Sequence, residues 1–145
     1  MENKTVGVNK MIKAIFFDID GTLVSFKTHQ VPDSTIEALK QLKKKGIKIF
    51  IATGRGKDGL KVLDEIEFDG YITLNGQYCY DKDRIIYQNT IDPHDLQNLV
   101  NYLDNHQVPC GFTEEHDKYY NYRDWRVDEI HRITQNDGQP AKDCS

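Results

Sequence analysis

The chain has 145 residues, of which 38% are hydrophobic and 29% are charged, and this composition is typical of one globular domain, or of one domain with part of another. Its 23 acidic and 19 basic residues give a formal net charge of -4, and no basic block could follow a nucleic-acid backbone. The sequence shows no signal-peptide pattern and no apolar run of membrane-spanning length. We therefore expect a cytoplasmic protein that binds neither nucleic acid nor membranes.

The first half of the chain predicts three strands alternating with helices. A short apolar run, Ala14 to Phe17, ends at Asp18 and is typical of a strand buried on both faces of a parallel sheet. Residues 47–52 and 71–74 predict the next two strands. Because βαβ connections are nearly always right-handed, we expect a Rossmann-like parallel sheet with helices packed on its faces. The predicted fold class is therefore α/β.

Two helices are expected between these strands. Ser34, with Glu37 three residues later, matches a capping box and predicts the start of the first helix. Gly46 predicts where this helix ends, because glycine adopts the left-handed conformation of a helix C-terminus at little cost. Residues 57–66 predict the second helix.

The pattern changes after the third strand, where a second unit is expected to begin. Residues 78–80 and 85–87 predict a hairpin rather than another crossover. Asp92 as N-cap and Pro93 at the first helical position then predict a helix start. Apolar residues spaced i, i+3, i+4 and i+7 give this helix one buried face: Leu96, Leu99, Val100 and Leu103.

Two carboxylates follow the first predicted strand. Asp18 and Asp20 are separated by one residue, and ligands of parallel α/β sheets bind beyond the carboxyl ends of the strands. Thr53 and Asn75 end the next two strands and are expected at the same edge. The pair of acids suits phosphoryl transfer, in which one carboxylate binds Mg2+ and attacks phosphorus while the other handles the proton of the leaving group. A lone Asp-x-Asp can also serve only as a turn former or a helix cap.

The segment Asp18-Ile19-Asp20-Gly21-Thr22-Leu23-Val24, directly after the apolar run, closely resembles the first signature of the haloacid dehalogenase (HAD) superfamily. The resemblance implies that Asp18 is the nucleophile and a metal ligand. It implies that Asp20 is the acid/base and offers its backbone carbonyl to the same metal. The implied cofactor is Mg2+, and the implied reaction is hydrolysis of a phosphomonoester through an aspartyl phosphate.

A second segment, Ile51-Ala52-Thr53-Gly54-Arg55, resembles the second signature of the superfamily. This resemblance implies that Thr53 and the amide of Gly54 hold the phosphoryl oxygens. Arg55 is interpreted either as a contact to phosphate or substrate or as a cap for the surroundings of the second helix. Leu74-Asn75-Gly76-Gln77 resembles the start of the α/β cap of Cof-like, type IIB sugar phosphatases, and Asn75 joins the implied binding residues. A sugar phosphate, preferably a hexose phosphate, is the implied substrate.

The resemblance divides the chain into three parts. Residues 1–10 are interpreted as a flexible N-terminal tail, residues 11–75 as the N-terminal part of the HAD-like core, and residues 76–145 as a partial α+β cap. A strand over 109–112 and a helix over 124–133 are expected within this cap.

The third and fourth signatures of the family, a lysine and a Gly-Asp stretch, normally follow the cap and are not found in this chain. The resemblance therefore implies an incomplete core, truncated within or after the cap. The alternative to a Mg2+-dependent phosphatase is a catalytically incomplete chain that binds metal, phosphate or a complementing partner without turnover. An unpaired sheet edge also predicts self-association.

Two further patterns have competing interpretations. Residues 54–59 satisfy G-x-G-x-x-G after a strand, which would indicate dinucleotide binding, but the motif follows the second strand and Asn75 stands where a ribose-binding acid is wanted. Glu114, Glu115 and His116 could contact sugar hydroxyls, although solvated loop residues are the simpler interpretation.

Three cysteines without CxxC spacing predict free thiols: Cys79, Cys110 and Cys144.

Overall fold

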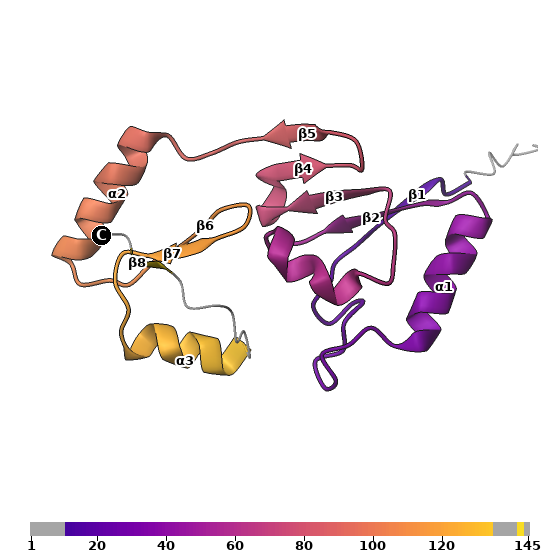
Figure 1. Ribbon diagram of the computed structural model, residues 1–145, viewed down its shortest axis with the longest axis horizontal. Coiled ribbons are helices and arrows are strands. Elements are labelled where there is room, and N and C mark those ends of the chain that lie inside the picture. Colours follow the sequence, from indigo (N-terminus) through magenta and orange to yellow (C-terminus); the bar gives the residue numbers. More distant parts are fainter. Residues whose placement is uncertain (1–10, 135–141, 144–145) are drawn as a thin grey trace, which may run out of the picture.

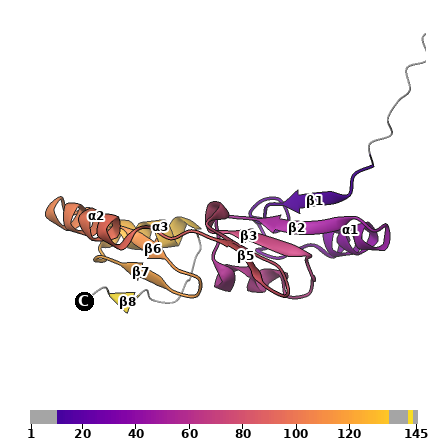
Figure 2. The same ribbon diagram turned by 90° about the horizontal axis from the view of Figure 1, so that it is seen from above.

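The computed structural model describes residues 11–134 and 142–143, which form two sheets (Figure 1). The first sheet has five strands in the order β1-β2-β3-β4-β5, and the second has three in the order β6-β7-β8. The two sheets lie side by side along the long axis of the molecule (Figure 2). The mixed, largely parallel first sheet with its helices confirms the predicted α/β class. The predicted tail, residues 1–10, lies outside the described residues.

The parallel part of the first sheet consists of β1 (Ala14–Phe17), β2 (Lys48–Ala52) and β3 (Gly70–Thr73), as predicted. Phe17 pairs with Ile51, and Ala52 pairs with Ile72. The three strands therefore end together, and their carboxyl ends form one edge of the sheet.

Two helices cover one face of this sheet. They are α1 (Asp33–Lys44) and the 3-10 helix η1 (Lys57–Leu63). Leu39 of α1 and Leu60 of η1 belong to the same buried cluster as Ile49 and Ile51 of β2. Because residues two apart in a strand point to the same face, both helices pack on that face.

The other face of the sheet is uncovered in the described part of the chain. Phe16 of β1 is 56% exposed and stacks on Phe50 of β2, with the ring centres 4.8 Å apart. The prediction that β1 is buried on both faces is therefore wrong. The apolar sequence of β1 reflects a preference for burial. Within the described residues, however, only β2 pairs with β1, and helices cover only one face of the sheet.

The start of α1 also differs from the prediction. The helix begins at Asp33 after Pro32, and no side chain caps it, so the capping box expected at Ser34 is wrong. Pro32 takes the N-cap position and places Ser34 within the first turn. The end agrees with the prediction: Gly46 has a φ of 74°, and the amides of Gly46 and Ile47 donate to carbonyls of the last turn, as in a Schellman motif.

The predicted hairpin consists of β4 (Tyr78–Tyr80) and β5 (Ile85–Gln88). β4 pairs antiparallel with β3, so the hairpin extends the first sheet instead of beginning a separate unit as we expected. The division into residues 11–75 and 76–145 stays a prediction, and this pairing favours a boundary after Gln88. β5 is an edge strand within the described residues and exposes Ile86, so self-association through a sheet edge also stays a prediction.

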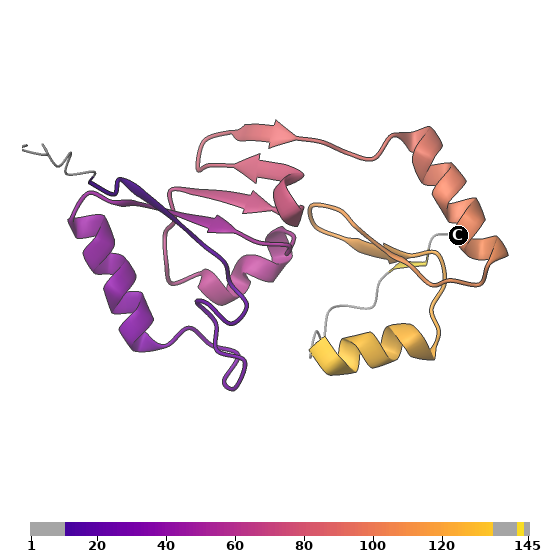
Figure 3. The ribbon, with the colours of Figure 1, turned by 180° about the vertical axis from the view of Figure 1, so that it is seen from behind.

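The second unit contains α2 (Pro93–Asn105), β6 (Gly111–Thr113), β7 (Lys118–Tyr120), α3 (Trp125–Thr134) and β8 (Lys142–Asp143). The carboxylate of Asp92 accepts the His94 N–H at 2.8 Å, which confirms the predicted N-cap. Among the described residues, the second unit buries three large apolar side chains, those of Leu103, Tyr120 and Val127. Viewed from behind, the β6–β7 hairpin reaches toward the first sheet (Figure 3).

Cys79 and Cys110 carry free thiols, as predicted, and Cys144 lies outside the described residues. No helix in residues 11–134 is long and apolar enough to cross a bilayer.

Candidate active site

A tight turn after β1 presents two carboxylates at the edge of the sheet. Ile19, between them, is fully buried in the core. Its carbonyl accepts the Val24 N–H at 2.9 Å, and the Gly21 N–H donates to the Val24 carbonyl at 3.0 Å. Gly21 has a φ of 77°, a conformation that glycine adopts without steric cost. The buried isoleucine anchors the turn, and Asp18 and Asp20 on either side of it are exposed.

The loop after β2 is fixed by hydrogen bonds on both sides. Thr53 is 7% exposed, and its hydroxyl accepts the Arg55 N–H at 3.2 Å. Its backbone carbonyl accepts the Asn75 N–H at 3.1 Å. A Cβ on Gly54 would lie 3.0 Å from the Oδ1 atom of Asn75, so the glycine lets this side chain approach the loop backbone. Thr53, Gly54 and Asn75 are therefore neighbours, as the sequence predicted.

Arg55 joins this loop to the acidic turn. Its Nε donates to Oδ2 of Asp20 at 3.0 Å, and its Nη2 donates to Oδ1 at 2.5 Å. Its Nη1 donates to the Gly59 carbonyl at 2.8 Å. The two signature segments thus meet through a bidentate ion pair. Asp18 lies at the end of β1, next to the strand that leads into Thr53. Local sequence gave no signal for the contact between Arg55 and Asp20.

The turn after β3 has an unusual backbone. Leu74, Asn75 and Gly76 have φ values of 50°, 54° and 93°, so three consecutive residues are left-handed. The Leu74 N–H donates to the Arg55 carbonyl at 3.1 Å, which ties this turn to the loop after β2. Left-handed residues other than glycine are strained and concentrate at functional sites. The Asn-Gly pair predicts a turn here, but not the left-handed leucine.

A contact from the second unit reaches the same region. The ammonium of Lys57, at the start of η1, is ion-paired with Glu115 in the turn between β6 and β7. It also donates to the Tyr78 hydroxyl at 3.4 Å and lies 4.6 Å from the centre of the Tyr80 ring. His116 Nε2 lies 3.3 Å from the Glu115 carboxylate. Glu115 is therefore held against the first sheet, and the solvated loop that we favoured from the sequence is wrong for this residue.

The contact shifts the pKa values of both partners. Burial alone would lower the pKa of Lys57, but hydrogen bonds to Glu115 and Tyr78 raise it above its usual value. The hydrogen bond from Lys57 holds the pKa of Glu115 below its usual value. Both groups are therefore charged at neutral pH.

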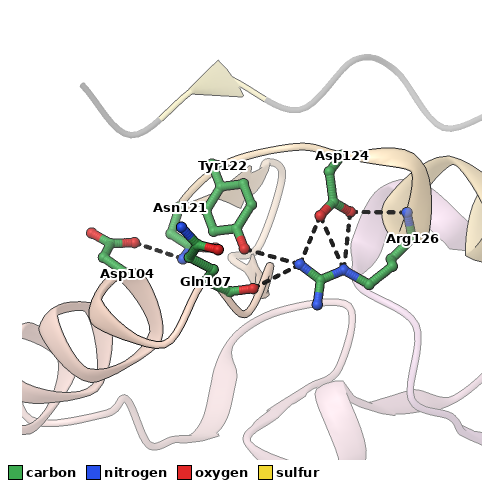
Figure 4. Close-up of a pocket in the computed structure, with 6 residues that line it drawn as sticks. All are labelled: Asp104, Gln107, Asn121, Tyr122, Asp124 and Arg126. Carbon is green, nitrogen blue, oxygen red and sulfur yellow. Dashed lines mark hydrogen bonds and ion pairs between the residues drawn. The ribbon is translucent and has the colours of Figure 1, made fainter.

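A polar pocket in the second unit is lined by six residues (Figure 4): Asp104, Gln107, Asn121, Tyr122, Asp124 and Arg126. The guanidinium of Arg126 binds both oxygens of Asp124, the Gln107 carbonyl and the Tyr122 hydroxyl. The Asn121 amide donates to Asp104 at 2.7 Å. These bonds join the C-terminal end of α2 to the segment that follows β7 and to the start of α3, so we assign the pocket a structural role.

The last three residues of the glycine-rich segment 54–59 already belong to the 3-10 helix η1. A dinucleotide fingerprint requires the N-terminus of a regular helix after its glycines, to hold a pyrophosphate. The local structure therefore disfavours the dinucleotide interpretation.

Comparison with known proteins agrees with this geometry. Residues 15–143 match the haloacid dehalogenase-like hydrolase family. The structure of BT1666 from Bacteroides thetaiotaomicron, one of the phosphatases of the haloalkanoate (HAD) enzyme superfamily, aligns with a TM-score of 0.83 and 33% identity over 98% of this chain and 54% of that one. The HAD subclass IIB sugar phosphatase BT4131 aligns with a TM-score of 0.68 and 41% identity over 86% of this chain and 48% of that one. Phosphatase YwpJ of Bacillus subtilis is 30% identical over 96 residues, which are 64% of this chain and 33% of that protein.

The chain thus spans about half the length of these two structures and a third of YwpJ. The family match runs through both sheets and includes the acidic turn and the loop after β2. On this match and this structure, the chain belongs to the haloacid dehalogenase-like hydrolases.

Proposed function

We propose that the chain carries the nucleophile and the acid/base of a Mg2+-dependent phosphomonoesterase that acts on sugar phosphates. The observation that carries this proposal is the ion pair between Asp20 and Arg55, which brings the two signature segments together at one edge of a parallel sheet. Carboxylates beside backbone amides at such an edge suit phosphoryl transfer. The likeness to the sugar phosphatase BT4131 supports the substrate class.

In the proposed reaction, the carboxylate of Asp18 attacks phosphorus and displaces the alcohol, which takes a proton from Asp20. Asp20 then removes a proton from the water that hydrolyses the aspartyl phosphate, and inorganic phosphate leaves. The hydroxyl of Thr53 and the amide of Gly54 bind the phosphoryl oxygens. Asn75, whose side chain lies against Gly54, contributes to the same binding site.

The residues of the acidic turn fit a magnesium ion. Mg2+ prefers oxygen ligands, and the exposed Asp18 carboxylate and the Asp20 backbone carbonyl are such groups. When bound, the ion neutralises the negative charge that two carboxylates and a phosphate bring together. We expect water and substrate oxygens to complete the coordination.

The proposal is tested by phosphate release from a panel of hexose phosphates, with and without Mg2+, by the whole chain. Any turnover should require Mg2+ and should be lost in Asp18→Asn and Asp20→Asn. Asp64→Asn serves as a matched control, because Asp64 is an exposed aspartate just after η1. Folded wild-type protein that releases no phosphate from any of these esters would contradict the proposal. Calorimetric binding of phosphate by that inactive protein would instead support the non-catalytic alternative.

A further inference from the structure

The phenyl ring of Phe26 lies on the acidic turn. A Cβ on Gly21 would be 2.8 Å from Cζ of Phe26, so the ring occupies the space that a side chain at position 21 would take. Phe26 is nevertheless 71% exposed. One side of the ring therefore contacts the backbone of Gly21, and most of the rest is free in the described part of the chain.

The loop that carries Phe26 follows the acidic turn directly and is closed by its own hydrogen bonds. The Ser25 N–H donates to the Gln30 carbonyl at 3.2 Å, and the His29 N–H donates to the Ser25 carbonyl at 2.8 Å. The Ser25 hydroxyl accepts the Lys27 N–H at 3.2 Å. Three hydrogen bonds thus meet at the residue before Phe26, and they fix the point from which the ring projects.

Phe26 does not belong to the core of the first unit. Among the described residues, the core cluster includes Val24, and Val31 packs against it, but Phe26 between them does neither. Other aromatic residues are exposed as well, such as Trp125 at 73%, so exposure alone indicates no site. The contact with Gly21, the residue after Asp20, is what distinguishes Phe26 from them.

The ring of Phe26 borders the place of the leaving alcohol. In the proposed reaction Asp20 gives a proton to this alcohol, so the alcohol lies against Asp20, and Gly21 with its bound ring comes next in the chain. In a sugar phosphate the alcohol is the sugar. A sugar ring has a face of C–H groups that can pack on an aromatic ring, whereas a short acyclic alcohol has no such face.

We propose that Phe26 is a specificity-determining residue that stacks on the sugar ring of the substrate and favours cyclic over acyclic phosphomonoesters. The inference rests on the proposed function, because it names the part of the substrate that the same site distinguishes. Thr53 and Gly54 bind the phosphoryl group, which all phosphomonoesters share. Loss of the Phe26 ring should therefore change the discrimination between alcohols and leave the affinity for the phosphoryl group as it is.

The test is calorimetric binding of two phosphonates to the whole chain with Mg2+. They are the analogues of glucose 6-phosphate and of glycerol 3-phosphate in which a methylene group replaces the ester oxygen, so that an active protein leaves them intact. We expect Phe26→Ala to weaken binding of the glucose analogue by about five- to tenfold, because one face of the ring is no longer buried. Binding of the glycerol analogue should stay the same. Phe26→Tyr keeps the ring and should bind both analogues as wild type does.

Trp125→Ala is the matched control, because Trp125 is as exposed as Phe26 but lies at the start of α3 in the second unit. Both affinities should be unchanged in this variant. A loss of affinity for the glucose analogue as large as that in Phe26→Ala would mark the effect as unspecific and overturn the inference.

The remaining outcomes separate the inference from the proposed function. Equal weakening of both analogues in Phe26→Ala, or no weakening of either, would overturn the inference while the proposed function stands. Wild-type protein that binds neither analogue would also overturn the inference. The proposed function falls with it only if the wild type releases no phosphate from the hexose phosphates either.

Discussion

Lys57 and Glu115 form an ion pair across 58 residues of sequence, between the start of η1 and the turn of the β6–β7 hairpin. The pair joins the second unit to the edge of the first sheet at which the candidate active site lies. Tyr78 and Tyr80 complete the contact by placing their rings beneath the ammonium. The geometry of this contact leads to two predictions, on its strength and on its dependence on pH.

A double-mutant cycle should detect coupling between the two charges. Lys57→Met and Glu115→Gln are expected to couple by about 0.5–1 kcal/mol in the free energy of unfolding, because the side chains are partly shielded and share aromatic contacts. Their exposed fractions are 28% and 35%, against 79% and 73% for Lys82 and Glu67, which lie 3.7 Å apart. The same cycle on Lys82 and Glu67 is the control and should give coupling near zero. Equal coupling in the two pairs, measured by urea unfolding, would contradict the prediction.

The contribution of Glu115 to stability should disappear in acid. The hydrogen bond from Lys57 holds the pKa of Glu115 in the folded protein below the ordinary value of 4.5. A lowered folded pKa means that the stabilisation is complete above that ordinary value and is lost as the pH falls through the folded pKa. The difference in unfolding free energy between wild type and Glu115→Gln should therefore shrink as the pH is lowered from about 7 to about 3. A difference that stays constant over this range would show that charge does not hold the contact.

Substitution of Gly21 should disturb the acidic turn more than its backbone angle alone explains. Gly21 and Gly46 have similar φ values, 77° and 74°, and alanine in this conformation costs about 1–2 kcal/mol. An added Cβ at Gly21 would also collide with the ring of Phe26, which is 71% exposed and would have to move, whereas no atom lies within 4 Å of one at Gly46. Gly21→Ala should therefore destabilise the protein more than Gly46→Ala. The Phe26→Ala substitution removes the ring and should make the stability costs of Gly21→Ala and Gly46→Ala equal, as measured by thermal unfolding. A difference that persists in this background would refute the steric explanation.

The left-handed backbone at Asn75 predicts different costs for two small substitutions. Alanine at a φ of 54° is unfavourable by about 1 kcal/mol, whereas glycine adopts this angle freely. Both substitutions remove the side chain that lies against Gly54. Asn75→Ala should therefore lower the melting temperature more than Asn75→Gly. Equal losses would mean that the side-chain contact, and not the backbone, sets the cost.

Strand positions and the edge of the candidate site were predictable from sequence, because each apolar run ends at a polar residue where the sheet ends. Asp18, Thr53 and Asn75 illustrate this, since each follows a predicted parallel strand directly. The burial of β1 was not predictable, because hydrophobicity reports what a side chain prefers and not which neighbours are present. Phe16 is apolar but lies on the uncovered face.

Side-chain contacts between distant segments were also beyond sequence reasoning. The ion pair of Arg55 with Asp20 depends on the direction of one guanidinium, and a carbonyl in the following helix, that of Gly59, sets this direction. The position of Glu115 depends on how the second unit packs against the first sheet. Neither the direction of the Arg55 guanidinium nor the position of Glu115 can be recognised from the sequence around these residues.

The left-handed turn Leu74 to Gly76 couples the candidate site mechanically to the β4–β5 hairpin. Its first two amides are bonded to the carbonyls of Arg55 and Thr53, and its last residues lead directly into β4. We therefore expect a displacement of the loop after β2 to move the hairpin as well, and a displacement of the hairpin to move that loop. Tyr78 of β4 also contacts Lys57, which is ion-paired with Glu115, so a chain of direct contacts runs from the hairpin to the second unit.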